Sequence, residues 1–288
     1  MKNFSTSGPL FSSNLSLNID GRIMNLSTPR VMGILNVTPD SFYDESRVPE
    51  PSLALERARE MIGQGADILD LGAVSSRPGA NQISEAEELE RLSPVLEALR
   101  EGFPDFPISV DTWRAGVART VRERFGVQMI NDISAGTMDP EMFPTMARLG
   151  IPYIIMHMQG IPANMQNDPE YDNVVDELLQ FFAERVHKLR LLGMNDIIID
   201  PGFGFGKTLG QNYKLLRQFD SFRMFELPLM AGVSRKSMIY RLLDSEPDAA
   251  LNGTTAAHMA LLVKGAKLLR VHDVEAAVET VKIFQQIY

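Results

Sequence analysis

A carboxylate beside a pliable loop is the first feature of the sequence that suggests chemistry. Asp200 follows the three β-branched residues Ile197–Ile199, which are typical of a short buried strand. Pro201 ends the strand because it cannot donate a backbone hydrogen bond. Three alternating glycines then lead to Lys207, and they allow backbone conformations that a Cβ would resist. An enzyme built on parallel strands can present a polar anchor to a small ligand in this way.

This stretch is not a nucleotide-binding loop. A Walker A loop needs a glycine five residues before its Gly-Lys-Ser/Thr end, and Pro201 occupies that position. A dinucleotide-binding fingerprint reads Gly-x-Gly-x-x-Gly, but here the third glycine comes one residue early and the acidic residue lies before the turn. The sequence therefore predicts a different kind of ligand site.

Polar residues end or follow each of eight short apolar runs. In a barrel of parallel strands these ends meet at one rim, where active sites are built. A single polar residue at a strand end often only caps the following helix, but polar residues at all eight strand ends indicate a binding site. The polar residues are Asn36; Asp70; Asp111; Asn131 and Asp132; His157; Asp200; Ser234, Arg235 and Lys236; and Arg270 and His272.

These residue types suggest two kinds of chemistry. Asp111, Asn131 and Asp200 suit the edge of a flat heterocycle with several N–H groups, because a carboxylate pairs with a guanidine-like edge through two charge-assisted hydrogen bonds. A second set of residues suits phosphate, and the amide side chain of Asn36 in this set is also a plausible oxygen ligand for Mg²⁺. That set is Asn36, Arg77, Arg270 and His272. Lys236 could serve either set, and neither a Ser/His/Asp triad nor a cysteine is evident.

The elements that position these residues repeat along the chain. The predicted strands are Val31–Leu35, Ile68–Leu71, Ile108–Val110, Gln128–Ile130, Tyr153–Met156, Ile197–Ile199, Leu229–Ala231 and Lys267–Leu269. The predicted helices are Leu53–Ile62, Glu85–Arg100, Ala115–Phe125, Glu141–Leu149, Val174–Leu192, Tyr213–Phe219, Leu251–Lys264 and Val274–Ile287. Eight alternating pairs predict an α/β fold, the (β/α)8 TIM barrel, in preference to an open doubly wound sheet.

Other segments complete this prediction. Leu15–Ile19 and Arg22–Leu26 flank Asp20-Gly21, so we expect an N-terminal β-hairpin that could close one end of the barrel. Residues 1–14 are rich in Ser and Asn and are predicted to be a flexible N-terminus, which leaves residues 15–288 as a single domain. The long segments Thr38–Pro51 and Ala73–Ser84 are predicted lids, and Ser84 with Glu87 predicts a capping box.

The composition excludes several classes of protein. The net charge of -9 over 288 residues argues against a nucleic-acid surface. The absence of cysteine excludes disulfides and thiol catalysis. Since no apolar run approaches the roughly 20 residues needed to span a bilayer, we expect no membrane association and a cytoplasmic location.

Several motifs resemble those of one family, dihydropteroate synthase, and they fall in order at successive strand ends. The resemblance covers the chain as far as Val274, and the set of motifs is highly specific. The matching segments are Met32–Phe42, Ser75–Gly79, Ser109–Thr112, Ile130–Ser134, Met156–Gly160, Asp200–Lys207, Gly232–Ser237 and Arg270–Val274. Ala73–Ser76 stands where the family has Gly-Glu-Ser-Thr, and the first loop also departs from the family pattern after Phe42.

The resemblance implies an activity. Such enzymes join 6-hydroxymethyl-7,8-dihydropterin diphosphate to p-aminobenzoate in folate synthesis and release pyrophosphate, with Mg²⁺. They are typically homodimers and sulfonamide targets, and here the apolar Ala256–Val263 segment could contribute to an interface. The implied mechanism is a dissociative substitution.

The resemblance also implies roles for individual residues. Asp111, Asn131, Asp200 and Lys236 would bind the pterin, with Met156 and Phe205 beside it. Asn36, Arg77, Arg270 and His272 would hold the diphosphate and its metal, for which Asn36 is the expected ligand. Ser76, Pro78, Lys236 and Ser237, with the loop around Pro39 and Phe42, would form the p-aminobenzoate pocket. Asp111, Asp200 and Lys236 are the expected catalytic residues.

Two alternatives share the barrel and the pterin carboxylates. One is a pterin-dependent methyltransferase domain that passes a methyl group to a corrinoid protein. The other is a non-catalytic pterin-binding paralogue with altered loops. Asn36–Phe42 and Ser234–Ser237 favour the synthase over the methyltransferase.

Overall fold

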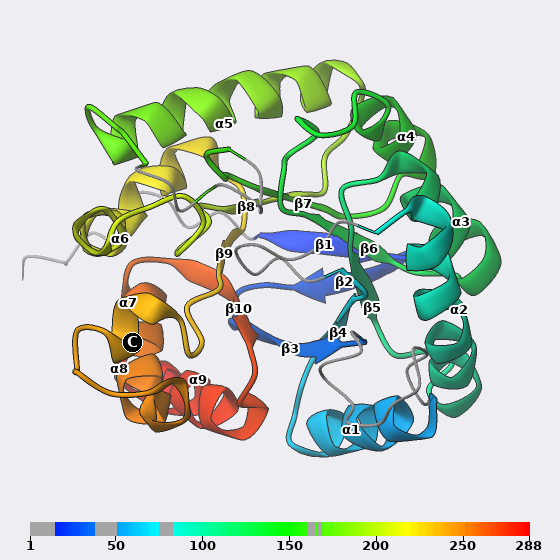
Figure 1. The fold of residues 1–288 in the computed structure, drawn as a ribbon, viewed down its shortest axis with the longest axis horizontal. Helices are drawn as coiled ribbons and strands as arrows, with labels where there is room; N and C mark the ends of the chain where they lie inside the picture. The colour runs from blue at the N-terminus through cyan, green and yellow to red at the C-terminus, as the bar shows by residue number, and fades with distance from the viewer. Residues whose placement is uncertain (1–14, 38–50, 75–82, 161–164, 166–168) are drawn as a thin grey trace, which may run out of the picture.

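The computed structural model describes residues 15–37, 51–74, 83–160, 165 and 169–288. Eight parallel strands close into a barrel in the order β10-β3-β4-β5-β6-β7-β8-β9, with helices around the outside (Figure 1). An antiparallel hairpin precedes them, so the predicted TIM barrel with an N-terminal β-hairpin is confirmed. The hairpin strands are β1 (Ser16–Ile19) and β2 (Arg22–Asn25). The barrel strands are β3 (Arg30–Asn36), β4 (Ile68–Gly72), β5 (Ile108–Asp111), β6 (Met129–Asp132), β7 (Tyr153–Met156), β8 (Ile197–Asp200), β9 (Leu229–Ala231) and β10 (Ala266–Val271).

The helices follow the predicted pattern with one clear error. The predicted helix Tyr213–Phe219 is present, but its bounds are wrong: α6 runs from Leu209 to Arg217, with Thr208 and Gln211 forming a reciprocal capping box, and Phe219 opens a 3-10 helix. The α-helices are α1 (Pro51–Gly63), α2 (Glu85–Gly102), α3 (Ala115–Phe125), α4 (Met142–Leu149), α5 (Val174–Leu191), α6 (Leu209–Arg217), α7 (Ser237–Tyr240), α8 (Leu251–Val263) and α9 (Val274–Ile287). The 3-10 helices are η1 (Phe219–Phe225) and η2 (Pro247–Ala249).

The Ser84 cap is present in part. Its side chain accepts a hydrogen bond from the Glu87 N–H, which is the expected N-cap of α2. The Glu87 carboxylate is engaged elsewhere, since it accepts from Arg91 one turn later at 2.6 Å.

Side-chain alternation separates two cores. Residues that point outward from the strands pack against the helices, as Leu69, Val110 and Ile155 do. Residues that point inward form a buried apolar layer inside the barrel, because successive strand residues face opposite sides. That inner layer contains Met32, Ile68, Met129, Ile154, Ile198, Met230 and Leu268.

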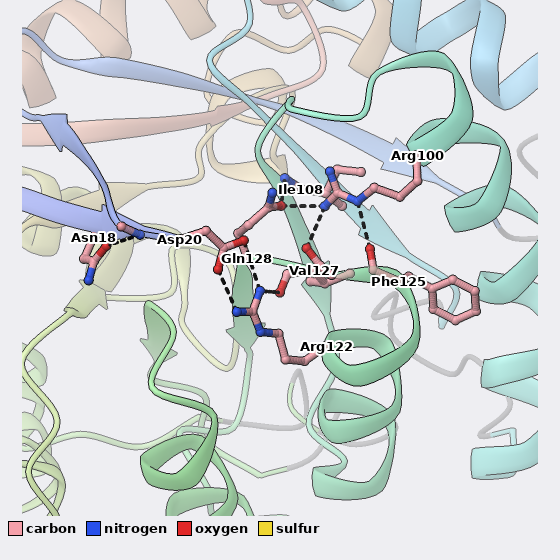
Figure 2. Close-up of polar contacts among 10 residues, drawn as sticks. Asn18, Asp20, Arg100, Ile108, Arg122, Phe125, Val127 and Gln128 are labelled. Carbon is pink, nitrogen blue, oxygen red and sulfur yellow. Dashed lines mark hydrogen bonds and ion pairs between the residues drawn. The ribbon is translucent and has the colours of Figure 1, made fainter.

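The hairpin covers the N-terminal end of this inner layer. Leu17 and Ile19 of β1 pack into the same cluster as the inner residues, together with Leu26. Polar contacts hold the hairpin in place (Figure 2): Arg122 of α3 donates to Asp20 at 2.6 Å and to the carbonyl of Val127 at 3.2 Å. The hairpin therefore closes the end of the barrel, as the sequence predicted.

Arg100 at the end of α2 fixes the entry to the next two strands (Figure 2). It donates to the carbonyl of Phe125 at 2.8 Å and to the side chain of Gln128, whose oxygen also accepts from the Ile108 N–H at 3.0 Å. This network sets the starting positions of β5 and β6, and the strands carry the site residues at their other ends.

Some predicted segments fall outside the residues that the structure describes. The predicted flexible N-terminus, residues 1–14, and most of both predicted lids fall outside the described residues. The assignment of residues 15–288 to a single domain stays a prediction. Among the described residues, no helix is both long enough and apolar enough to cross a membrane.

Candidate active site

The candidate site lies one layer above the buried apolar layer inside the barrel, at the C-terminal ends of the strands. The register explains why polar residues gather there. A residue two positions after each inner apolar residue points the same way but lies nearer the rim. The pairs are Ile68 and Asp70, Met129 and Asn131, Ile198 and Asp200, and Leu268 and Arg270.

Arg270 is the centre of a network that joins four strands. Its Nε donates to Asp70 at 2.6 Å and its Nη2 donates to Asp111 at 2.9 Å. The same oxygen of Asp70 accepts from the Asn131 amide at 3.0 Å. The structure thus brings together three residues predicted for ligand binding: Arg270 contacts Asp111 directly and Asn131 through Asp70.

Asp111 has an unusual protonation equilibrium. Burial raises the pKa of its carboxyl group to about 7, while Arg270 opposes this shift and Asp70 adds to it. An arginine partner and a set of N–H donors both favour the ionised form of a carboxyl group. A cationic or N–H-rich ligand would therefore favour the ionised form of Asp111, and the carboxylate would in turn bind that ligand.

Asp200 and Lys236 form the second charged group of the site. Burial raises the pKa of Asp200, and the nearby Lys236 counteracts this shift. The Gly202 N–H donates to Asp200 at 2.8 Å and fixes the carboxylate at the end of β8. Burial lowers the pKa of Lys236 to about 8, with Asp200 acting in the opposite direction.

Lys236 also connects the site to the loop after β8. Its ammonium group donates to the carbonyl of Phe203 and lies 4.5 Å from the centre of the Phe205 ring. A cation over an aromatic face is attracted by the ring quadrupole. Phe205 and Lys236 therefore hold each other beside Asp200.

An apolar cluster borders these polar groups. Trp113, Ile133 and Met156 are buried, and Phe205 packs against them while partly exposed. Val74, Met138 and Met158 complete the cluster. An apolar surface next to convergent carboxylates suits a flat heterocycle, which needs both a face contact and edge partners.

A cavity of about 490 Å³ opens beside Asn36 and His272. It lies between the ends of β3 and β10 and the first helix, α1, which contributes Arg57 and Glu60. Burial and the charge of Arg270 lower the pKa of His272 to about 4, so its imidazole is neutral at pH 7. The cavity is large enough for a small ligand group beside Asn36 and His272.

Ser237 opens the four-residue helix α7, with Lys236 at the N-cap position. This short helix was not among the eight helices predicted from the sequence. Ser76, Arg77 and Pro78, and the loop residues Pro39 and Phe42, lie outside the described residues, so their predicted roles stay predictions.

Sequence reasoning missed three residues of this region. Asp70 was noted as a strand end but was given no role, although a carboxylate inside an apolar strand needs a buried partner. Trp113 is the only tryptophan in the chain and comes two residues after Asp111. Lys207 was read as the end of a glycine-rich loop, and the structure buries it beside His157 at 3.2 Å. His157 thus faces Lys207 inside the protein.

No cluster of three or more His, Asp or Glu residues suited to a metal ion occurs in the part of the chain that the structure describes. A metal that uses few protein ligands would need other partners here, such as phosphate oxygens. The amide oxygen of Asn36, which lines the cavity beside His272, could supply one ligand, and the carboxylates of Glu56 and Glu60 line the same cavity.

Known proteins resemble the chain over almost its whole length. A family model described as pterin binding enzyme matches residues 32–272. The dihydropteroate synthase of Haemophilus influenzae is 42% identical over 273 residues, covering 94% of this chain and 98% of that enzyme. The dihydropteroate synthase of Escherichia coli K12 is also 42% identical, covering 94% of this chain and 96% of that enzyme.

Solved structures give the same result. The Yersinia pestis dihydropteroate synthase in complex with a sulfonamide drug superposes with a TM-score of 0.88 at 41% identity, covering 95% of this chain and 99% of that one. The Xanthomonas albilineans dihydropteroate synthase with 4-aminobenzoic acid has a TM-score of 0.88 at 39% identity, covering 96% and 98%.

Proposed function

The chain belongs to the pterin-binding enzymes and acts as a dihydropteroate synthase in folate biosynthesis, and on that premise we propose how its residues divide the reaction. The reaction joins 6-hydroxymethyl-7,8-dihydropterin diphosphate to p-aminobenzoate and releases pyrophosphate. The observation that carries the assignment of residues is the convergence of Asp111, Asn131, Asp200, Lys236 and Arg270 at one end of the barrel.

Asp111, Asn131 and Asp200 bind the edge of the pterin ring. The carboxylates accept from its guanidine-like N–H groups, and the Asn131 amide completes the polar edge. Met156 and Phe205 pack beside the ring, because they belong to the apolar cluster next to these groups. Lys236, whose ammonium group lies over the Phe205 ring, would donate a hydrogen bond to the pterin.

The diphosphate lies toward Asn36, His272 and Arg270. The cavity between β3, β10 and α1 provides the space, and Arg270 provides a positive charge that Asp70 and Asp111 orient. Arg77 would join them from the second loop. When bound, Mg²⁺ would be held by the amide oxygen of Asn36 and by phosphate oxygens, and it would neutralise the charge of the leaving group.

Departure of pyrophosphate comes first in this proposal. The pterin ring delocalises the positive charge that develops at its methylene carbon, and the carboxylates of Asp111 and Asp200 stabilise that charge in a buried site. The aniline nitrogen of p-aminobenzoate then attacks the carbon and releases its proton. No strong base is required, because the electrophile is already a cation.

The p-aminobenzoate pocket lies at the Lys236–Ser237 end of the site. Lys236 stands at the N-cap of α7 and Ser237 is its first residue, and Ser76 and Pro78 would close the pocket from the second loop. Sulfonamides carry the same aniline ring, so they compete for this pocket.

We further propose a homodimer and a cytoplasmic location. Helix α8 supports the first proposal, since Val263 is exposed on it while Thr254, His258 and Leu261 are buried on another side. Exposed apolar residues on a barrel helix suit a second copy of the chain.

Product formation tests this function. Purified protein with the pterin diphosphate, p-aminobenzoate and Mg²⁺ should release pyrophosphate and form dihydropteroate in equal amounts. Methyl transfer from a methylated folate to a corrinoid protein would indicate the methyltransferase instead. Pterin binding without product would indicate a non-catalytic paralogue.

A further inference from the structure

Lys207 is a buried cation to which the reaction above gives no role. Its side chain is 3% exposed. The ammonium nitrogen lies 2.9 Å from the carbonyl oxygen of Gly202 and 3.0 Å from that of Phe205. The carbonyl oxygen of His157 lies 3.3 Å away and its Nδ1 lies 3.2 Å away. Three carbonyl oxygens match the three donors of an ammonium group.

These partners favour the charged form of Lys207. A neutral amine has only two N–H donors for three carbonyl groups. Burial lowers the pKa of Lys207 to about 7, and Asp200 opposes this shift. Burial, Lys207 and Arg185 lower the pKa of His157 well below its usual value, so its ring is neutral and Nδ1 can accept a hydrogen bond.

The contacts join two loops at the rim of the barrel. His157 belongs to the loop after β7, and Gly202 and Phe205 belong to the loop after β8. The loops approach each other closely at Gly202, where φ is +71° and a Cβ would lie 2.1 Å from the carbonyl oxygen of His157. Only glycine fits this position without moving one of the loops.

Two further side chains form hydrogen bonds with the backbone of the loop after β8. The Gly204 N–H donates to the side chain of Asn212 at 2.7 Å. Tyr171 donates to the carbonyl of Gly206 at 2.8 Å. The conformation of the loop after β8 is therefore determined by side chains around it, with Lys207 at its centre.

This loop carries three groups of the candidate site. Its Gly202 N–H fixes the Asp200 carboxylate, its Phe203 carbonyl accepts from Lys236, and its Phe205 ring lies beside Lys236. A change in the loop would move all three. Lys207 itself is too buried to touch a ligand, so it acts through them.

We propose that Lys207 is a positioning residue for pterin recognition, and that its ammonium group clamps the loops after β7 and β8 so that Asp200 and Phe205 lie in place for the ring. The proposal rests on the function given above. It concerns a side chain at the end of the glycine-rich stretch, and it assigns to that side chain a role chiefly in binding the pterin.

The test compares Lys207→Met and Lys207→Gln with the parent. Methionine keeps much of the length but none of the donors, while glutamine keeps two N–H donors without the charge. Since a hydrogen bond to a charged group contributes about 1.5–3 kcal/mol, we expect the Kd for 6-hydroxymethylpterin, measured by calorimetry, to rise about tenfold or more in Lys207→Met. The Kd of Lys207→Gln for 6-hydroxymethylpterin should lie between the values for the parent and for Lys207→Met. The KM for p-aminobenzoate, at saturating pterin diphosphate, should rise by a smaller factor than this Kd, because only Lys236 of the p-aminobenzoate pocket depends on the loop after β8.

Lys188→Met is the matched control, because Lys188 is exposed on α5. A purely structural role for Lys207 would lower kcat and the calorimetric stoichiometry by reducing the folded fraction, while leaving Kd and both KM values unchanged. That result would overturn the proposal. If Lys207→Met does not fold, Lys207→Gln decides between the same two outcomes at a temperature where circular dichroism shows it folded.

The experiments distinguish a failure of the proposed function from a failure of the role proposed for Lys207. A parent that forms no dihydropteroate would refute the activity, while the calorimetric comparison of Lys207 variants would still measure pterin binding. An active parent with a Lys207→Met variant of unchanged pterin affinity would refute only the role of Lys207.

Discussion

Asp70 shows how much of the site depends on one buried side chain. Its carboxylate accepts from Arg270 and from Asn131, and Arg270 in turn reaches Asp111. Four strands are tied together by these three hydrogen bonds. A carboxylate in the interior is tolerated because its partners are charged or polar, and in exchange it fixes their orientation.

Asp200→Ala should fold but lose pterin affinity. The substitution removes a carboxylate that makes charge-assisted hydrogen bonds of roughly 1.5–3 kcal/mol each. We therefore expect the Kd for a pterin to rise about 10- to 150-fold by calorimetric titration. Glu279→Ala, an exposed change on α9, serves as the control. A folded Asp200→Ala variant with parental affinity would remove Asp200 from the pocket.

Ser237→Phe should weaken sulfonamides more than p-aminobenzoate. Both ligands carry the same aniline ring, but a drug extends beyond the outline of the substrate. A bulky side chain at the start of α7 narrows that end of the pocket. The measurement compares the sulfonamide inhibition constant with the KM for p-aminobenzoate in parent and variant. Equal losses for both ligands would show that Ser237 does not line the part of the pocket where they differ.

Among the elements, the hairpin and the loop after β8 have opposite tasks. The hairpin closes the N-terminal end of the barrel with apolar side chains and carries no site residue. The loop after β8 lies at the C-terminal end and carries Phe205 beside the site. In barrels of this kind, the N-terminal end contributes stability and the C-terminal end contributes catalysis.

Leu17→Ala in β1 should therefore lower stability without changing the KM values. Leu17 is 1% exposed and packs on the inner layer of the barrel. Truncating a buried leucine costs about 2–5 kcal/mol. Urea unfolding measures the loss, and Ile23→Ala in β2 is the control because Ile23 is 72% exposed. A change in either KM at a temperature where Leu17→Ala is folded would contradict this separation.

At the scale of the whole molecule, buried histidines connect stability to pH. His258 is buried in α8, and within the described structure neither ring nitrogen has a hydrogen-bond partner. Burial lowers its pKa to about 4, with Asp273 acting in the opposite direction. The unfolded chain binds more protons between pH 6.5 and pH 4, so the free energy of unfolding falls as pH decreases through this range.

His258→Met should make this pH dependence shallower. The histidine contribution corresponds to about 2 kcal/mol between pH 7 and pH 5. Urea unfolding of parent and variant at these two pH values gives the comparison. His272 has a similarly lowered pKa and remains in the variant, so some dependence should persist. An identical fall in both proteins would mean that His258 is protonated without unfolding.

The sequence by itself determined the barrel, its hairpin and most of its rim. These features follow from local patterns: β-branched runs, helical periodicity, a turn dipeptide and polar residues at strand ends. Even the error at α6 was local, since Thr208 and Gln211 mark the helix start in the sequence. The activity was inferred from the family motifs, which lie at the strand ends where a barrel places its active site.

Only the tertiary structure decided which polar groups meet. Arg270 and Asp70 are 200 residues apart in the chain, and Lys207 and His157 are 50 apart. Such contacts depend on the closure of the barrel and on the register between neighbouring strands, which local patterns do not contain. For the same reason the shifted pKa values of Asp111, Lys207 and His272 follow from burial and from neighbours that the fold supplies.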